Sequence, residues 1–321
     1  MDKIDYVITY VDGSDPEWQK DYNEVADKPI DFRKSERFRS WDNLRYNLRA
    51  VEKNLPFVGN VYLVVARDSQ VPKWINRETV KVVLHKDFIP EKYLPVFSST
   101  AIEMFLGFIP GLSERFIYAN DDTFVMSSCG VRDFFVAGGL PVLNYNETKT
   151  AYNSTSQYEI QLKNSFLLAK KAGNNKYPFT KITPKHSVNP MTVSSYRKVW
   201  DACGEEIESK INKFRTDWDC NQYLFSFYEI VTGHFAKSAA VTSRYMNFTN
   251  KAPISVAEFI KNTKAKLVCI NDAGTRDFNL AKVYINNALK QRFPRVSKYE
   301  TMTPEEKKNR SEERRVGKEC R

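Results

Sequence analysis

Segment 116–125 places two adjacent carboxylates between two apolar runs. A β-prone run leads directly into Asn120, Asp121 and Asp122, and the apolar pattern then resumes. A buried strand that ends in acidic residues delivers their side chains to the edge of a sheet. Mg²⁺ and Mn²⁺ prefer oxygen ligands and hold substrate phosphates, so the pair favours a metal site for a nucleotide diphosphate. The alternative is an ordinary turn, because Asn and Asp stabilise turns through their own backbones.

Two other strand-like segments also end in polar residues. Residues 4–11 are β-branched and aromatic, and they break into a turn at Asp12, Gly13 and Ser14. Glycine allows a close backbone approach, while Asp and Ser can bind a ligand or cap a helix. Open α/β sheets bind nucleotides after the first strand, although this turn is not a G-x-G-x-x-G motif and is weak evidence alone. Residues 267–272 repeat the pattern of a short strand that ends in Asn-Asp.

A helix that Ser40 can cap, running to about residue 54, carries Arg45 and Arg49 one turn apart. Two like charges at this spacing cost free energy unless an anion lies between them. The pair therefore points to a bound anion, or else to a surface helix with unpaired arginines. Residues 21–39, just before this helix, are polar and charged, which predicts a long loop or a mobile flap.

The elements that must position these residues alternate between strands and helices in the first half of the chain. The strand-like segments are residues 4–11, 60–66, 79–84 and 116–125. Near-continuous apolar strands separated by helices indicate a parallel sheet that is covered on both faces. We therefore predict an α/β fold with a Rossmann-like sheet, in which Asp12 and the pair Asp121 and Asp122 lie at strand ends on the same side.

The second half of the chain reads as mainly helical. Helices are predicted at residues 157–171, 193–203, 222–232 and 279–292. The third is rich in aromatic residues, which more often indicates core packing than a stacking surface.

Composition limits the class of protein. With 321 residues, 42% of them hydrophobic, the chain can bury a large core. No apolar run approaches the roughly 20 residues that span a bilayer, and no secretory signal precedes the first strand, so we expect a cytoplasmic protein. The net charge of +10 implies anionic partners such as phosphates or an anionic membrane surface. Nucleic acid is a minor hypothesis, because no nucleic-acid-binding motif accompanies the charge.

The five cysteines are scattered and no pair has C-x-x-C spacing, so we expect reduced thiols. Residues 310–321, with Cys320, have no periodicity and no core residues. They resemble an appended tail, and we expect them to be disordered.

Taken together, these segments resemble the Stealth family, phosphotransferases that build hexose-phosphate capsular polymers in bacteria. The family also includes the catalytic part of animal N-acetylglucosamine-1-phosphotransferase. The matching motifs are residues 4–15, 37–39, 44–49, 85–87, 94–95, 101–103, 110–118 and 120–122, then His186 with Pro190, residues 214–215 with Asp219, and residues 269–272, 293–294 and 299–300. The resemblance spans nearly all of residues 1–300. Asn43 departs from it, because the family usually has Glu there.

The resemblance implies transfer of a hexose- or N-acetylhexosamine-1-phosphate from a UDP-sugar to a hydroxyl of a glycan acceptor. A phosphodiester forms and UMP leaves, in capsular or exopolysaccharide synthesis. A metal-dependent glycosyltransferase that releases UDP, or a non-catalytic binding protein for sugar nucleotides or polyanions, is the alternative. The implied partners are the UDP-sugar, a growing capsular polymer and, peripherally, the inner face of the cell membrane.

The implied fold is GT-A-like, a mostly parallel sheet flanked by helices, with a helical C-terminal portion that completes the site. Residues 1–309 would form a single catalytic domain. Within it, residues 1–140 bind nucleotide and metal, 141–184 are a variable insert, and 185–300 carry further site residues.

The resemblance also suggests roles for individual side chains. Divalent-metal ligands, for Mg²⁺ or Mn²⁺, would be Asp121, Asp122 and Asp272. Substrate-binding residues would be Asp12, Gly13, Ser14, Arg39, Arg45 and Asn120, with the arginines on phosphate oxygens. Catalytic residues would be Asp121, Arg215 and His186, the last as general base. A hydrogen-bonded structural histidine is the alternative for His186.

Overall fold

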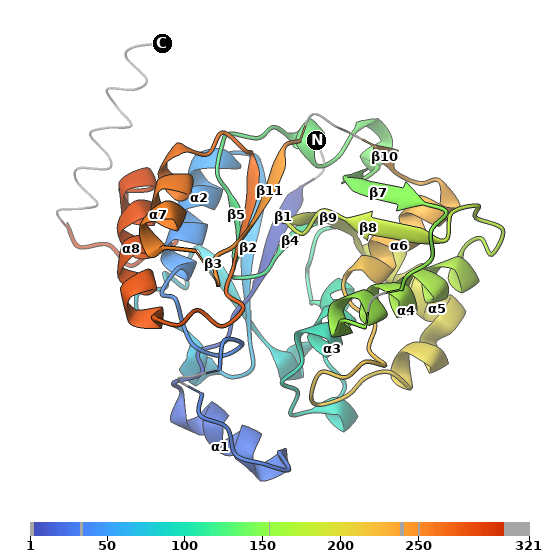
Figure 1. Ribbon diagram of the computed structural model, residues 1–321, viewed down its shortest axis with the longest axis horizontal. Coiled ribbons are helices and arrows are strands. Elements are labelled where there is room, and N and C mark those ends of the chain that lie inside the picture. The colour runs from blue at the N-terminus through green and yellow to red at the C-terminus, as the bar shows by residue number, and fades with distance from the viewer. Residues whose placement is uncertain (1–2, 33–34, 154, 238–240, 250, 305–321) are drawn as a thin grey trace.

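A five-stranded sheet lies at the centre of the computed structural model, which describes residues 3–32, 35–153, 155–237, 241–249 and 251–304 (Figure 1). In spatial order its strands are β3 (Val80–Leu84), β2 (Val58–Val65), β1 (Ile4–Thr9), β4 (Arg115–Ala119) and β9 (Asn189–Thr192). The first four strands are parallel, and β9 pairs antiparallel with β4. The predicted α/β fold with a mostly parallel sheet is confirmed.

The central strand β1 is buried on both faces. Val7 belongs to the apolar cluster on one side of the sheet, and Tyr6 and Ile8 belong to the cluster on the other side. This alternation follows from the two-residue period of a strand. Because β1 and β4 pair in parallel up to Ile8 and Ala119, the loops that follow both strands leave the same edge of the sheet.

A second sheet continues from the first at the acidic turn. Its strands, in spatial order, are β11 (Ser243–Asn247), β12 (Leu267–Asn271) and β5 (Thr123–Val125). The predicted strand 116–125 is therefore two strands, β4 and β5, and the turn between them joins the two sheets. Smaller two-stranded sheets pair β6 (Val142–Leu143) with β10 (Ala236–Lys237) and β7 (Tyr145–Thr148) with β8 (Lys181–Pro184).

The helices form two groups on either side of the strands (Figure 1). One group comprises α2 (Leu44–Asn54), α7 (Pro253–Asn262) and α8 (Phe278–Arg292). The other comprises α3 (Ser99–Glu103), α4 (Gln157–Ala172), α5 (Val193–Glu208) and α6 (Tyr223–Thr232). Short 3-10 helices are η1 (Asp68–Gln70), η2 (His85–Asp87), η3 (Glu91–Tyr93), η4 (Leu106–Phe108), η5 (Val131–Asp133) and η6 (Ala137–Gly139). Within the ranges that the structure covers, no helix combines the length and apolar character needed to cross a membrane.

Two local predictions were wrong. The segment predicted to be a loop or flap contains the second half of helix α1 (Pro16–Val25), which Asp15 caps by accepting a hydrogen bond from the Glu17 amide. The helix is held by Trp18 and Tyr22, which are buried in an aromatic cluster. Helix α2 begins at Leu44 rather than at a cap formed by Ser40, and its N-cap residue Asn43 makes no capping bond.

The part of the chain after residue 184 shares both sheets with the part before residue 140. Strand β9 pairs with β4, and β12 pairs antiparallel with β5. The C-terminal part thus contains strands as well as the predicted helices. The expected domain limits stay a prediction, and the expected tail at 310–321 lies outside the described residues.

Candidate functional site

The turn between β4 and β5 carries Asn120, Asp121 and Asp122. Within the described ranges, Asn120 Oδ1 and Asp122 Oδ1 are buried and accept no hydrogen bond. A buried oxygen without a partner is costly, so both atoms call for a donor or a cation. Carboxylate and amide oxygens are the donors that Mg²⁺ and Mn²⁺ prefer, and this turn therefore fits the expected metal.

The two carboxylates of the turn perturb each other. Burial, and next the neighbouring Asp122, raise the pKa of Asp121 to about 7. Two adjacent carboxylates in a partly buried site repel each other, and a cation between them would relieve that repulsion.

Helix α2 fixes the backbone of this turn with three asparagine side chains. Asn43 donates to the Asp121 carbonyl at 2.9 Å, and Asn47 and Asn54 donate to the carbonyls of Thr123 and Val125, each at 2.6 Å. The three carbonyl acceptors belong to every second residue, so they point to the same edge of β5. The opposite edge of β5 pairs with β12. The asparagines replace a neighbouring strand and hold the turn against the helix.

Three side chains from different elements meet at Asp122. Potential metal-binding atoms of Asp122, His186 and Cys269 all lie within 4.8 Å of one another. Cys269 lies on β12 opposite Thr123, and its thiol donates to Asp122 Oδ2 at 3.2 Å. Burial and Asp122 raise the pKa of Cys269 well above its usual value, so the thiol is protonated. The oxygens of the turn, rather than this thiol, are the ligands that fit Mg²⁺ or Mn²⁺.

Three tyrosine rings surround His186. Its Nδ1 lies 2.8 Å from the hydroxyl of Tyr223, which is buried on α6. The rings of Tyr158 on α4 and Tyr245 on β11 have centroids 6.3 Å and 6.2 Å from that of His186. Because one ring nitrogen is held by Tyr223, the other is left for a substrate proton or a metal.

Arg215 lies near the buried carboxyl of Glu103. The Arg215 guanidinium donates a hydrogen bond to Ser99 Oγ. Burial lowers the pKa of Arg215, and the negative charge of Glu103 opposes that effect. Burial raises the pKa of Glu103 to about 7. Glu103 accepts from the Gln222 amide at 2.8 Å and from the Tyr118 hydroxyl at 3.4 Å. These contacts hold the Glu103 carboxyl between the end of β4 and the residue before α6.

The turn after β1 is built on contacts within the chain. Asp12 Oδ1 accepts from both the amide and the hydroxyl of Ser14, at 2.9 Å and 2.6 Å. Gly13 donates to the Phe38 carbonyl at 3.1 Å, and a methyl group on Gly13 would overlap that oxygen. The close backbone approach that the glycine permits is therefore to residues 35–39 of the same chain.

Asp272 makes different contacts from those of a metal ligand. Arg39 Nε donates to Asp272 Oδ2 at 2.7 Å, and the amides of Gly274 and Thr275 donate to Oδ1. Among described residues, Asp272 lies outside the group formed by Asp122, His186 and Cys269. Both of its oxygens already accept hydrogen bonds within the chain, and its predicted ligand role stays a prediction.

Arg45 and Arg49 do have an anion between them, and it is Glu300. Arg49 binds both Glu300 oxygens at 2.8 Å and 2.9 Å, and Arg45 Nε lies 3.4 Å from Oε2. Arg45 also covers the ring of Trp74 at 4.8 Å. These contacts attach α2 to the C-terminal segment, whereas the sequence predicted a phosphate contact for Arg45.

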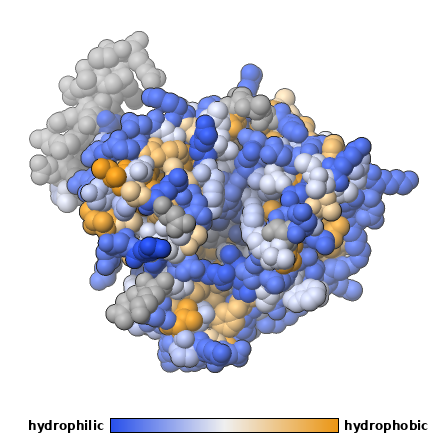
Figure 2. All heavy atoms as spheres, viewed as in Figure 1, coloured by the Kyte–Doolittle hydropathy of each residue, from blue (hydrophilic) through white to orange (hydrophobic). Residues whose placement is uncertain are grey.

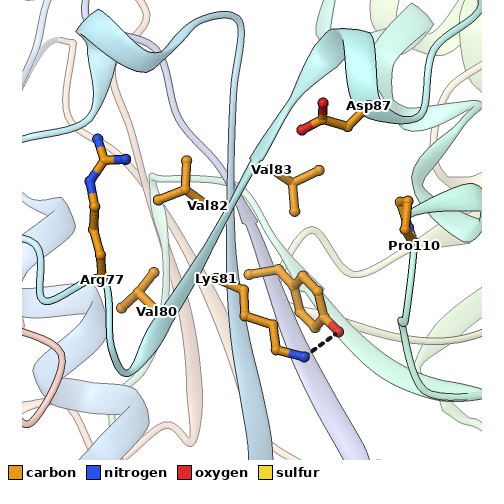
Figure 3. Close-up of a pocket in the computed structure, with 8 residues that line it drawn as sticks. Arg77, Val80, Lys81, Val82, Val83, Asp87 and Pro110 are labelled. Atoms are coloured by element: carbon orange, nitrogen blue, oxygen red, sulfur yellow. Dashed lines mark hydrogen bonds between the residues drawn. The ribbon is translucent and has the colours of Figure 1, made fainter.

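The face shown in Figure 2 is hollowed between the two groups of helices, with a mostly hydrophilic rim. A separate groove follows the free edge of β3 (Figure 3). It is lined by Tyr62, Arg77, Lys81, Asp87 and Pro110 with three valines of β3, and Lys81 donates to the Tyr62 hydroxyl at 3.3 Å. None of these residues belongs to the group at Asp122.

Sequence reasoning missed four residues around His186. Cys269 belongs to a strand pattern that was recognised, but its contact with Asp122 depends on the pairing of β12 with β5, which no local pattern reveals. Tyr223 was assigned to the core, which is correct, although its hydroxyl also holds His186. Tyr158 and Tyr245 had no distinguishing sequence signal.

Comparison with known proteins gives consistent matches. Residues 37–143 match the model of Stealth protein conserved region 2. The receptor polysaccharide phosphotransferase WefC of Streptococcus oralis is 30% identical, over 94% of this chain and 100% of that protein. A capsular polysaccharide phosphotransferase of Actinobacillus suis is 32% identical, over 92% of this chain and 82% of that protein. The exopolysaccharide phosphotransferase cps2G of Lactiplantibacillus plantarum is 28% identical, over 92% and 96%.

Among solved structures, the galactosyltransferase LgtC with donor and acceptor sugar analogues is similar at a TM-score of 0.41 and 12% identity. The match covers 95% of this chain and 99% of that one.

Proposed function

Because the chain belongs to the Stealth family of polysaccharide phosphotransferases, we propose that it transfers a hexose- or N-acetylhexosamine-1-phosphate from a UDP-sugar to a hydroxyl of a glycan acceptor. A phosphodiester forms and UMP is released, in capsular or exopolysaccharide synthesis. The observation that carries the proposal is the meeting of Asp122 and His186 at the turn between the two sheets, with Asp121 beside them. Carboxylates suited to a divalent ion beside a histidine that can accept a proton support the proposal.

In the proposed reaction, the acceptor oxygen attacks the phosphorus that is bonded to the sugar. The bond from that phosphorus to the bridging oxygen breaks, and UMP leaves with this oxygen. His186 accepts the proton of the acceptor hydroxyl, and Tyr223 holds the imidazole in position through Nδ1.

Asp121, Asp122 and the amide oxygen of Asn120 would hold the divalent ion. When bound, Mg²⁺ or Mn²⁺ neutralises charge on the diphosphate. Arg215 supplies positive charge to the transferring phosphoryl group, and Glu103 orients it electrostatically. Arg39 contacts donor phosphate, with Asp272 fixing its guanidinium through the ion pair.

The nucleotide that is released tests this proposal. The full chain is incubated with a panel of UDP-hexoses and UDP-N-acetylhexosamines, Mg²⁺ or Mn²⁺, and an oligosaccharide acceptor. UMP is the expected product, and its release stops with a chelator and in Asp122→Asn. Release of UDP would instead assign the chain as a glycosyltransferase. A failure of every donor would favour the non-catalytic alternative.

We also infer that the protein attaches peripherally to an anionic membrane surface. Four large apolar side chains are exposed on α7 and α8, namely Ile254, Leu280, Val283 and Tyr284. Figure 2 shows orange areas over the region of these helices. Exposed lysines and arginines of the same region are Lys251, Lys261, Lys264, Arg276, Lys290 and Arg295, against the exposed acids Glu258 and Asp277. An apolar patch within a basic surface suits anionic lipid. The expected cytoplasmic location stays a prediction.

A further inference from the structure

Two exposed tyrosines flank the candidate base. Tyr158 is 45% exposed and Tyr245 is 53% exposed, whereas the third ring at His186, that of Tyr223, is almost fully buried. The two exposed rings come from different elements, α4 and β11. Their centroids lie 6.3 Å and 6.2 Å from that of the imidazole. Large aromatic side chains left open beside a polar site are candidates for ligand contacts.

The in-line geometry of phosphoryl transfer decides which substrate lies there. The attacking and leaving oxygens lie on opposite sides of the phosphorus. The base His186 must contact the attacking hydroxyl, so the acceptor is on its side and UMP leaves on the other. Rings that contact His186 are therefore next to the acceptor sugar rather than next to the uridine.

The chemistry of the two rings also suits a sugar. A tyrosine hydroxyl is neutral at physiological pH, because its ordinary pKa is about 10. A neutral ring with a hydroxyl offers an apolar face to the C–H groups of a pyranose and a hydrogen-bonding group to its hydroxyls. It offers no charge to a phosphate.

We propose that Tyr158 and Tyr245 form an acceptor-sugar platform, which holds a neutral hexose unit of the acceptor glycan with its reacting hydroxyl at His186. This inference rests on the proposed function. The platform selects the acceptor without contacting the donor diphosphate.

The test compares Tyr158→Ala and Tyr245→Ala with Leu167→Ala, an equally exposed apolar residue on α4. Each tyrosine variant is expected to raise the KM for the oligosaccharide acceptor about tenfold. The KM for the UDP-sugar and the slow acceptor-free hydrolysis of the donor should change less than about twofold. Tyr158→Phe and Tyr245→Phe should recover most of the acceptor affinity, because they keep the ring.

A rise in donor KM with an unchanged acceptor KM would overturn the proposal and assign the rings to uridine. Unchanged constants in both alanine variants would also overturn it. If the chain turns over no donor at all, saturation-transfer NMR with the neutral oligosaccharide separates the two ideas. Glycan binding that is lost in the tyrosine variants supports the platform even if the proposed reaction fails, and its absence from the unaltered chain overturns it.

Discussion

Asp122 directly precedes β5 and Asp272 directly follows β12, but the surroundings of their carboxylates differ. Asp122 has one buried oxygen without a donor in the part of the chain that the structure describes. Asp272 has Arg39 on one oxygen and two backbone amides on the other. A carboxylate that is fully engaged has less to offer a cation than one with a free lone pair.

We therefore expect Asp122→Asn to weaken Mn²⁺ binding at least tenfold and Asp272→Asn to change it less than about twofold. Asp272→Asn should instead raise the KM for the UDP-sugar, because Arg39 loses its charged partner. Electron paramagnetic resonance of free Mn²⁺ measures the affinity directly. Loss of Mn²⁺ binding in Asp272→Asn would restore the ligand role that the sequence predicted.

The buried carboxyl of Glu103 makes the stability of the protein depend on pH. Its neighbours are Arg215, Asp219 and the hydroxyl of Tyr118, and burial raises its pKa from 4.5 to about 7. The folded state thus binds a proton that the unfolded state releases between these values. The contribution is fully present below about pH 4.5, and it is lost as the pH rises to about 7.

The expected loss is at most about 3 kcal/mol of unfolding free energy across that range. Glu103→Gln should reduce the slope of this part of the pH profile, since an amide keeps the hydrogen bonds without a titrating proton; the slope that remains belongs to Asp121, whose pKa is also raised to about 7. Urea denaturation at several pH values measures the effect, with the exposed Glu258→Gln as control. An unchanged pH slope in Glu103→Gln would show that another group titrates.

At the scale of elements, the buried face of helix α2 follows from the sequence, whereas the partners of its polar side chains do not. The residues Leu44, Leu48, Val51 and Leu55 lie on one face of the helix and are buried, as helical periodicity requires. The partners of its polar residues come from distant segments. The spacing of Arg45 and Arg49 left two alternatives, a bound anion or unpaired surface arginines, and the anion that lies between them is Glu300, which only tertiary packing places there.

The asparagine contacts of α2 predict the behaviour of Asn47→Ala. This change leaves the buried Tyr6 hydroxyl and the Thr123 carbonyl without their partners, because Asn47 bonds to both. We expect a loss of about 2–4 kcal/mol in unfolding free energy. Activity should fall as well, because the acidic turn loses a support.

Chemical denaturation and Mn²⁺ affinity are measured together, with the exposed Asn287→Ala of α8 as the matched control. If Asn47→Ala unfolds too readily to assay, Asn47→Asp tests the same contact, because it keeps the acceptor for Tyr6 and removes the donor to Thr123. Full stability and full metal affinity in both variants would contradict the supporting role of α2.

At the scale of the whole molecule, the alternation of strands and helices predicted the parallel sheet and the edge at which its loops meet. The pairing of β12 with β5 could not be predicted, because it joins segments far apart in the chain. The same limit applies to the site. Asp121, Asp122 and His186 were chosen from local patterns and resemblance. Cys269 and Tyr245 reach the site only through the second sheet, and Tyr158 and Tyr223 reach it from α4 and α6.

The exposed apolar side chains on α7 and α8 provide the final prediction. The full chain should sediment with phosphatidylcholine vesicles that contain phosphatidylglycerol, and much less with phosphatidylcholine alone, because each basic residue near an anionic surface contributes about 1 kcal/mol. Val283→Asp should weaken this binding about tenfold, since it places a charge in the apolar contact.

Leu167→Asp is the matched control, because Leu167 is similarly exposed but lies on α4, in the other group of helices. Added salt should also weaken binding, as screening reduces the attraction of the basic residues. Equal losses in both variants would show that the contact is not made by α7 and α8, and a chain that stays in the supernatant with anionic vesicles would refute attachment through lipid.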